Sequence, residues 1–288
     1  MRVAIAGIRG FIGQHLKARL EADGHKTIGV ERQWARTPFT GVDAFVWAGG
    51  PSRHVETLSA VEAGIAVADW TLLLDIMARN GPIHAVLLSS HAVYGRAYWK
   101  PPGEPYAENE PLRPTSLYGA LQASREHMGM AMFHSKRLPF TALRLSTVYG
   151  PGMREDALVR VFIDAALKGS EIRLEGGGKQ IRPFIHVEDV AVFVARVLAA
   201  GGPAEGNVFN IVADHAAVAT LARECSEAAL ALGRPGARIV TTKPRPAEPG
   251  NTVLDSTKAA RLLGWCSAIT LDRGIPLTAA AMLAEVGK

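Results

Sequence analysis

Three glycines spaced three residues apart, Gly7, Gly10 and Gly13, stand between a short apolar run and an amphipathic segment. The run Arg2–Ala6 has the length of a buried strand, and Phe11–Ala22 repeats apolar residues at helical period. Glycines in such a turn let the backbone approach a pyrophosphate, which the N–H groups at the helix start can bind. The spacing is GxxGxxG rather than the commoner GxGxxG. In this context it predicts a dinucleotide-binding strand–turn–helix unit.

The alternation of strands and helices continues along the chain. We predict strands at Arg2–Ala6, Thr27–Val30, Ala44–Ala48, Ala85–Ser89, Thr141–Ser146 and Val208–Val212, and helices at Phe11–Ala22, Glu56–Arg79, Leu117–Ser135 and Val187–Ala200. Strands that alternate with helices form right-handed βαβ units. The predicted fold class is therefore α/β, a Rossmann-type doubly wound parallel sheet covered by helices on both faces.

A change of composition in the second half predicts a smaller C-terminal substrate-binding part. Pro, Gly and Arg become dense around 150–183 and again around 233–250. The predicted dinucleotide-binding domain comprises residues 1–149 plus about 183–213, and the substrate-binding part comprises about 150–182 plus 214–288. The segment 97–114, rich in Pro, Gly and aromatic residues, is predicted to be a long loop beside the ligand site.

The charge and the cysteines exclude several classes of protein. The formal net charge of +5 suits an anionic ligand, but the basic residues are scattered, so we expect no nucleic-acid binding. The two cysteines, Cys225 and Cys266, lack metal-ligand spacing and predict neither zinc nor a disulfide framework. No apolar run is long enough for a membrane span. The apolar start is also too short for a signal peptide, so we expect a cytoplasmic protein.

The end of the second predicted strand bears on the cofactor. Glu31 lies 24 residues after Gly7, where a carboxylate can bind both hydroxyls of an adenine ribose and repel a 2′-phosphate. Arg32 follows directly and could instead hold that phosphate. The pair favours NAD and leaves NADP open.

Two further segments carry the chemistry, LLSSHAVYG at 87–95 and SLYGALQASRE at 116–126. They resemble the serine and YxxxK segments of extended short-chain dehydrogenases/reductases, the NAD-dependent sugar epimerase/dehydratase family. The resemblance continues in the same order through LRLSTVYGPG at 143–152, GGGKQIRPFIHVEDVA at 176–191, NVFNI at 207–211 and LDSTKAARLLGW at 254–265. It therefore covers essentially the whole chain.

The resemblance implies catalytic roles for Ser90, Tyr118 and Gln122, the last at the position of the family lysine. The serine hydroxyl would hold a substrate oxygen, while the phenol exchanges a proton as hydride moves to or from nicotinamide. Cofactor contacts are implied at the three glycines and at Phe11, Ile12, Glu31, Arg32, Ala48, Gly49, Ser89, Tyr118 and Gln122.

One position departs from the family pattern. The lysine expected four residues after Tyr118 is Gln122, while Glu126 stands where the family usually has glutamate. Lowering a phenol pKa from about 10 to about 7 amounts to roughly 4 kcal/mol, and glutamine brings no charge to do so. Arg125 is close in sequence, but we do not expect it on the helical face of Tyr118. A Gln122→Lys substitution is therefore expected to raise activity near neutral pH.

The resemblance also bears on the reaction and the substrate. Family dehydratases have acidic residues directly after the catalytic Ser or Thr, but here His91 and Ala92 follow, which favours an epimerase. His91 is either a supplementary acid/base that contacts substrate or an ordinary packing histidine. Arg182 and Arg245 occupy segments that supply diphosphate-binding arginines in the family. Thr147 replaces a usual asparagine among the substrate-binding positions.

We therefore predict a nucleotide-sugar epimerase-like enzyme that uses NAD. Two alternatives stay open: an NAD(P)H-dependent reductase of keto-sugars or other ketones, and a non-catalytic NAD-binding protein that has lost the lysine. The resemblance implies a homodimer formed through the predicted helices 56–79 and 117–135.

Overall fold

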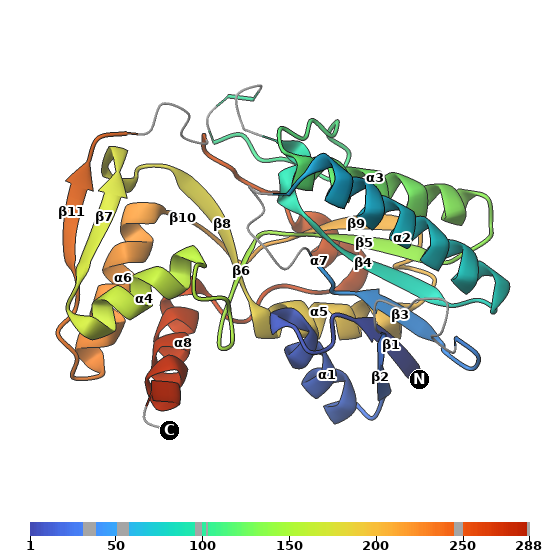
Figure 1. Ribbon diagram of the computed structural model, residues 1–288, viewed down its shortest axis with the longest axis horizontal. Helices are drawn as coiled ribbons and strands as arrows, with labels where there is room; N and C mark the ends of the chain where they lie inside the picture. Colours follow the sequence, from blue (N-terminus) through green and yellow to red (C-terminus); the bar gives the residue numbers. More distant parts are fainter. Residues whose placement is uncertain (31–38, 51–57, 96–99, 102, 245–249, 287–288) are drawn as a thin grey trace.

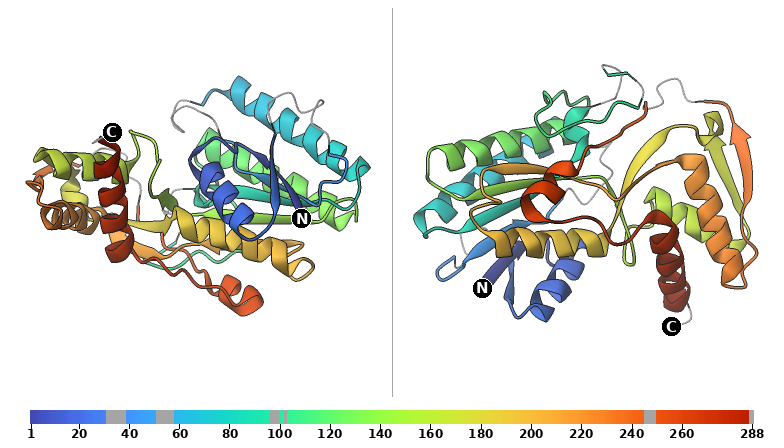
Figure 2. Two further views of the ribbon diagram at one scale, coloured as in Figure 1. Left: turned by 90° about the horizontal axis from the view of Figure 1, so that it is seen from below. Right: turned by 180° about the vertical axis from the view of Figure 1, so that it is seen from behind.

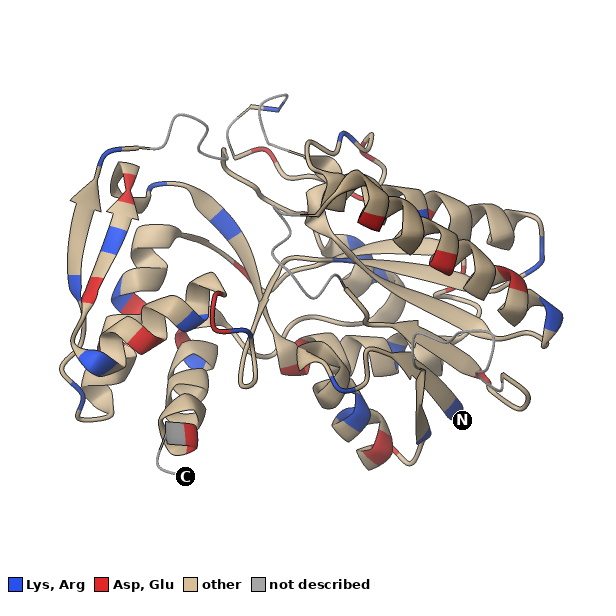
Figure 3. Cartoon of the chain, in the orientation of Figure 1, with Lys and Arg blue, Asp and Glu red and all other residues tan. Residues whose placement is uncertain are grey.

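The structure is a computed structural model, which describes residues 1–30, 39–50, 58–95, 100–101, 103–244 and 250–286. Two parts lie side by side (Figures 1 and 2). The larger contains the N-terminus and a six-stranded sheet, and the smaller contains the C-terminal helix. Among the described residues, no helix is both long and apolar enough to span a membrane. Basic and acidic positions are scattered over both parts (Figure 3).

The larger part is built on six parallel strands, which confirms the predicted fold class. They are β1 (Arg2–Ala6), β2 (Lys26–Val30), β3 (Ala44–Trp47), β4 (His84–Ser90), β5 (Phe140–Leu145) and β9 (Asn207–Ile211). Their order is β2-β1-β3-β4-β5-β9, and every neighbouring pair is parallel. The chain moves outward from β1 to β2 and then crosses back to β3. In such sheets ligands bind at the carboxyl ends of the strands where the order reverses, here between β1 and β3.

Helices cover both faces of this sheet. On one face lie α1 (Phe11–Ala22) and α5 (Val187–Ala200), and on the other lie α2 (Ala60–Arg79) and α3 (Leu117–His134) (Figures 1 and 2). Helix α2 begins behind a capping box formed by Ser59 and Glu62, later than the predicted start at Glu56. Its Trp70 packs edge-on against Phe140 of β5 and anchors α2 in the core.

The smaller part contains elements that the sequence analysis did not resolve. They are β6 (Thr147–Tyr149), α4 (Leu158–Lys168), β7 (Glu171–Glu175), β8 (Ile181–His186), β10 (Asp214–Ala217), α6 (Val218–Ala231), β11 (Arg238–Thr242) and α8 (Leu271–Val286). The strands form two small sheets, β10-β8-β6 and β11-β7. Helix α7 (Thr257–Leu263) instead packs near β9 and α5 of the larger part. The short helices η3 (His91–Tyr94) and η5 (Gly176–Gly178) complete the description.

The start of α1 joins the two parts. Phe11 packs against the core of the smaller part, and its ring meets that of His15 edge-on. His15 in turn contacts the Pro151 carbonyl oxygen at 2.9 Å and the Glu188 carboxylate at 2.7 Å. The glycine turn in front of α1 is therefore held next to the smaller part.

Candidate active site

The glycine turn is too tight for side chains at two of its three glycines. Gly7 has φ of +80°, and a Cβ there would lie 2.8 Å from the Ala48 carbonyl oxygen. A Cβ at Gly13 would lie 2.0 Å from the Gly7 carbonyl oxygen, so only glycine fits between strand and helix. Gly10 is the N-cap of α1, with an ordinary negative φ of −78°.

The helix start behind this turn offers an anion site. No described side chain caps α1, and its first turn carries no acidic residue. Free N–H groups and the positive end of the helix dipole therefore face the turn. Ala48 and Gly49 follow β3 directly beside it, and the Ala48 amide donates to the Ala6 carbonyl at 3.0 Å. Ile12 packs against the main core. These residues fit the pyrophosphate of a dinucleotide at the point where the strand order reverses.

Ser90, Tyr118 and Gln122 meet at the carboxyl end of β4. Ser90 ends that strand, and its hydroxyl accepts from the Ala92 amide at 3.2 Å as η3 begins. Tyr118 lies in the first turn of α3, behind the Ser116 cap, which places the phenol next to the strand end. The Gln122 side-chain amide donates to the Leu88 carbonyl at 3.3 Å and reaches the Tyr118 hydroxyl at 3.5 Å.

The environment of Tyr118 has opposing effects on the pKa of its phenol. Burial raises the pKa of the phenol. Hydrogen bonds with Ser90 and Gln122 and the positive charge of Arg125 act against burial and lower the pKa, but the net shift stays upward. Without further help, Tyr118 is therefore a neutral phenol near pH 7.

Arg125 corrects one expectation from the sequence. Seven residues turn a helix through about 700°, so Arg125 lies only about 20° from Tyr118 around α3. Its guanidinium is buried, stacks 4.7 Å above the Trp47 ring, and donates to the Gln122 side-chain oxygen at 3.0 Å. The prediction that Arg125 lies off the face of Tyr118 was wrong.

A buried ion pair that sequence reasoning missed holds α3 against the sheet. Arg144 of β5 binds both carboxylate oxygens of Glu126 through contacts of 2.8 to 3.2 Å. The same guanidinium donates to the Tyr94 hydroxyl at 2.8 Å, which donates to Asn210 at 2.7 Å. Ser89, predicted to contact cofactor, donates its hydroxyl to Glu126. An arginine within an apolar strand was the only signal for this network in the sequence.

The predicted substrate residues lie on the side of the smaller part. His91 contacts the Leu145 carbonyl at 3.1 Å through Nδ1. Burial lowers the pKa of His91, the contact with Leu145 opposes that effect, and the charge of Arg182 lowers the pKa further. Arg182 of β8 donates to the Gly250 carbonyl at 2.8 Å. Thr147 of β6 pairs in register with Phe184 of β8. His91 is therefore neutral and within the electrostatic reach of Arg182.

Three predicted site residues, Glu31, Arg32 and Arg245, lie outside the described residues. Gly250, which binds Arg182, directly follows the segment that contains Arg245. The described residues contain no group of three or more side chains suited to hold a metal ion.

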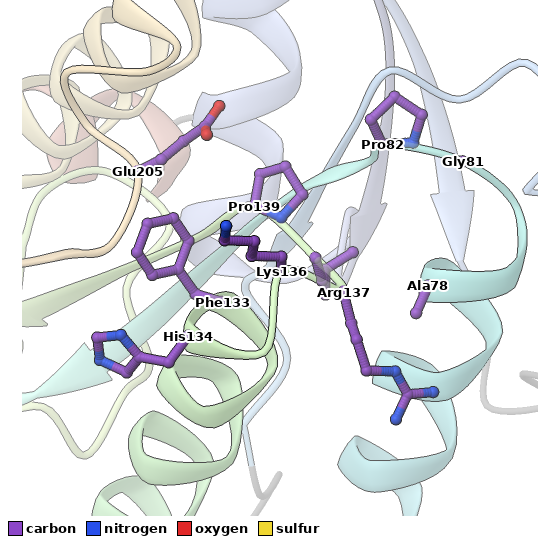
Figure 4. Close-up of a pocket in the computed structure, with 10 residues that line it drawn as sticks. Ala78, Gly81, Pro82, Phe133, His134, Lys136, Arg137, Pro139 and Glu205 are labelled. Carbon is purple, nitrogen blue, oxygen red and sulfur yellow. The ribbon is translucent and has the colours of Figure 1, made fainter.

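A separate surface pocket lies far from this site. Its volume is about 640 Å³, and the ends of α2 and α3 and the loops before β5 and β9 line it (Figure 4). Lys136, Arg137 and Glu205 are among its lining residues. Since it lies at the amino ends of the strands, it is not the pocket in which a doubly wound sheet binds its cofactor.

Comparison with known proteins connects this geometry to a family. The sequence profile of the NAD dependent epimerase/dehydratase family matches residues 3–212. The "Probable UDP-glucuronate 4-epimerase" of Rhizobium meliloti is 29% identical in an alignment of length 261 that covers 77% of this chain and 74% of that protein. The UDP-glucose 4-epimerase of Mycolicibacterium smegmatis is 28% identical over 96% of this chain and 97% of its own length.

Solved structures support the fold. A crystal structure of the UDP-glucose 4-epimerase of Thermus thermophilus in complex with NAD superposes with a TM-score of 0.85. The match covers 98% of this chain and 99% of the other at 24% identity. At that identity the likeness establishes the Rossmann-type fold of the whole chain.

Proposed function

Because the chain belongs to the NAD-dependent epimerase/dehydratase family of enzymes, we propose that it is a nucleotide-sugar epimerase in which Tyr118 and Ser90 handle the proton. The observation that carries the proposal is the meeting of Tyr118, Ser90 and Gln122 at the carboxyl end of β4. The residues after Ser90 are His91 and Ala92, so the acids that a dehydratase needs for elimination are missing there. Epimerisation requires only a hydride and one proton to move and return.

In the proposed epimerisation, each group has a separate role. Bound NAD would supply the hydride acceptor at one sugar carbon. The Tyr118 oxygen takes the hydroxyl proton as that carbon becomes a carbonyl, and it gives the proton back to the same oxygen when hydride returns to the opposite face of the carbonyl carbon. The Ser90 hydroxyl holds the same substrate oxygen in place. The three-glycine turn and the α1 N-terminus bind the cofactor pyrophosphate.

NAD rather than NADP is the cofactor that we propose. The support is Glu31, which directly follows the last residue of β2 in the sequence; a carboxylate at this position of the family pattern can accept hydrogen bonds from both ribose hydroxyls. A 2′-phosphate beside that carboxylate would place like charges together.

We propose that the smaller part binds the nucleotide diphosphate. Arg182 on β8 and Arg245 after β11 supply two guanidinium groups on separate segments, which suits the oxygens of a pyrophosphate. Thr147 and His91 face the sugar in this proposal. We also propose the domain division predicted from the sequence. In it, residues 1–149 plus about 183–213 bind the dinucleotide, and residues about 150–182 plus 214–288 bind the substrate.

A homodimer through α2 and α3 is also proposed. Val61, Ile65 and Leu72 of α2 and Leu117 of α3 are large apolar side chains with 45 to 73% of their surface exposed. Burying that face against a second copy would remove it from water. Sedimentation should show a dimer that Ile65→Asp dissociates. A cytoplasmic location remains a prediction, which cell fractionation would test.

Turnover of nucleotide sugars tests the proposal. The purified protein with NAD is incubated with a panel of UDP- and dTDP-hexoses and hexuronates, and products are followed by NMR. We expect interconversion of two epimers without net NADH formation, and no conversion by Tyr118→Phe. Stoichiometric oxidation of added NADH would instead show a reductase. Tight NAD binding with no turnover across the panel would show a non-catalytic protein.

A further inference from the structure

The side-chain amide of Gln122 has only one orientation compatible with its neighbours. A guanidinium can only donate hydrogen bonds and a carbonyl can only accept them. Arg125 therefore holds the Gln122 oxygen at 3.0 Å, and the Leu88 carbonyl accepts from its nitrogen at 3.3 Å. The same NH₂ group lies 3.5 Å from the Tyr118 hydroxyl, so it presents a donor to the phenol oxygen.

Such a donor acts differently on the two states of the phenol. A phenolate accepts strong hydrogen bonds, whereas a neutral phenol must share its oxygen between donating and accepting. The positive charge on Arg125 also polarises the amide that lies between the two side chains. The row Arg125–Gln122–Tyr118 thus favours the ionised form of Tyr118.

We propose that Arg125, acting through Gln122, is the positioning residue that supplies the positive charge for Tyr118 in place of the missing lysine. The proposal rests on the proposed function, since it concerns the acid/base residue of that site. Arg125 has no carboxylate within ion-pair distance among the described residues. Its charge is therefore not cancelled by a neighbouring anion in direct contact.

The other charged groups around α3 leave this arrangement intact. Asp69 of α2 raises the pKa of Arg125 electrostatically, which favours the charged form of the guanidinium. The charge of Glu126 is balanced by Arg144 of β5. His91 of η3 is held at the Leu145 carbonyl, and burial keeps it neutral. Within the described part, Arg125 is the charge that bears on the phenol.

This geometry changes the expectation for Gln122→Lys. A lysine at position 122 would bring its ammonium group against the Arg125 guanidinium, which now lies 3.0 Å from the Gln122 oxygen. Two cations in one buried space repel each other. The single substitution should therefore not raise activity above that of wild type, whereas Gln122→Lys combined with Arg125→Met should restore the activity that Arg125→Met alone loses.

The test compares wild type, Arg125→Met, Gln122→Lys and the double variant. Methionine keeps the packing against Trp47 without charge, and the Trp70 bond to Arg125 is unaffected because it uses the backbone carbonyl. The first readout is the ultraviolet titration of the Tyr118 phenol in NAD-loaded protein, taken as the difference from Tyr118→Phe. It requires no substrate.

We expect Arg125→Met to raise the midpoint of this titration by about one pH unit or more. Such a shift lowers the fraction of phenolate at a given pH below the midpoint by about tenfold. The double variant should return it to the wild-type range. Where turnover is found, kcat near neutral pH should fall about tenfold in Arg125→Met, with KM and NAD affinity changed less than about twofold.

The outcomes separate the two proposals. Unchanged titration in Arg125→Met, or a Gln122→Lys single variant that is more active than wild type near neutral pH, would overturn the role of Arg125. The expected titration shifts without turnover of any nucleotide sugar would support that role and contradict the proposed function. Turnover of a nucleotide sugar without the expected titration shifts would support the proposed function and contradict the role of Arg125.

Discussion

Removing the Glu126 carboxylate should destabilise the protein strongly, because it leaves Arg144 as an uncompensated buried charge. The two side chains are only 3% and 5% exposed. In Glu126→Ala the guanidinium keeps the Tyr94 hydroxyl and the Glu108 carbonyl as acceptors, at 2.8 and 3.0 Å, and loses both carboxylate oxygens. Breaking a buried pair from one side typically costs about 3–5 kcal/mol.

Chemical and thermal denaturation measure this cost. A change of 1 kcal/mol shifts the melting temperature of a domain of about 150–250 residues by about 2–4 °C, so we expect a drop of about 6–20 °C. The matched control is Arg19→Ala, which removes an ion pair between Arg19 and Asp23 that is 31 to 39% exposed. That loss should cost about 0.3–0.5 kcal/mol.

A double variant shows whether charge is the cause. Replacing Glu126 by Leu and Arg144 by Met removes both charges and keeps comparable volume. It should recover most of the stability that Glu126→Ala loses. A Glu126→Ala variant that loses less than about 1 kcal/mol, or a double variant no more stable than the single one, would refute the reasoning.

Four further predictions follow from the site and the core. Gly10→Asp should abolish NAD binding in a folded protein, because φ at Gly10 is ordinary and a Cβ 3.1 Å from the Gly7 carbonyl oxygen requires only a small shift, while the added carboxylate repels the pyrophosphate. Calorimetry, with circular dichroism as the folding control, checks this prediction. Glu31→Ala should narrow the preference for NAD over NADP in the same calorimetric assay, and a wild type that prefers NADP would contradict the assignment. Arg182→Ala should weaken nucleotide-diphosphate binding by about 1.5–3 kcal/mol with NAD affinity nearly unchanged, and equal binding of UDP to both proteins would argue against the clamp. Burial lowers the pKa of His84 from 6.5 to about 4, so that the unfolded chain binds the proton before the folded protein does as the pH falls. The free energy of unfolding, measured with urea, should therefore fall by about 2 kcal/mol between pH 7 and pH 5, and this pH dependence should be absent in His84→Gln.

The elements of the larger part could be predicted because parallel strands that are buried on both faces appear in the sequence as unbroken apolar runs. All six strands of the main sheet lie within a residue or so of their predicted bounds, and α1 and α5 match at both ends. The elements of the smaller part were missed. Helix α4 carries an apolar stripe at Val159, Phe162, Ile163 and Ala166, but the Pro, Gly and Arg around it indicated only a smaller substrate-binding part without defined elements. The strands of the smaller part are only three to six residues long, so that even the alternating pattern of Glu171–Glu175 gives a weak signal.

The site divides in the same way between local and long-range information. Ser90 ends a predicted strand and Tyr118 opens a predicted helix, so their approach follows from local structure and the order of the sheet. The partner of Arg144 could not be predicted, since nothing in an apolar strand indicates which carboxylate, 18 residues earlier on a helix, will lie opposite. The place of Arg125 could have been predicted from helical spacing alone.

Arg125 and Tyr118 are best treated as one titrating unit. Burial lowers the pKa of Arg125 to about 10, which still leaves the guanidinium almost fully protonated at pH 7. Tyr118 raises the pKa of Arg125, and Arg125 lowers that of Tyr118. Linkage requires the two effects to be equal in free energy, so each proton leaving the phenol stabilises the buried cation by the same amount. The substitution of lysine by Gln122 therefore need not abolish acid/base chemistry, because the cost of burying Arg125 is partly recovered in the state in which Tyr118 is ionised.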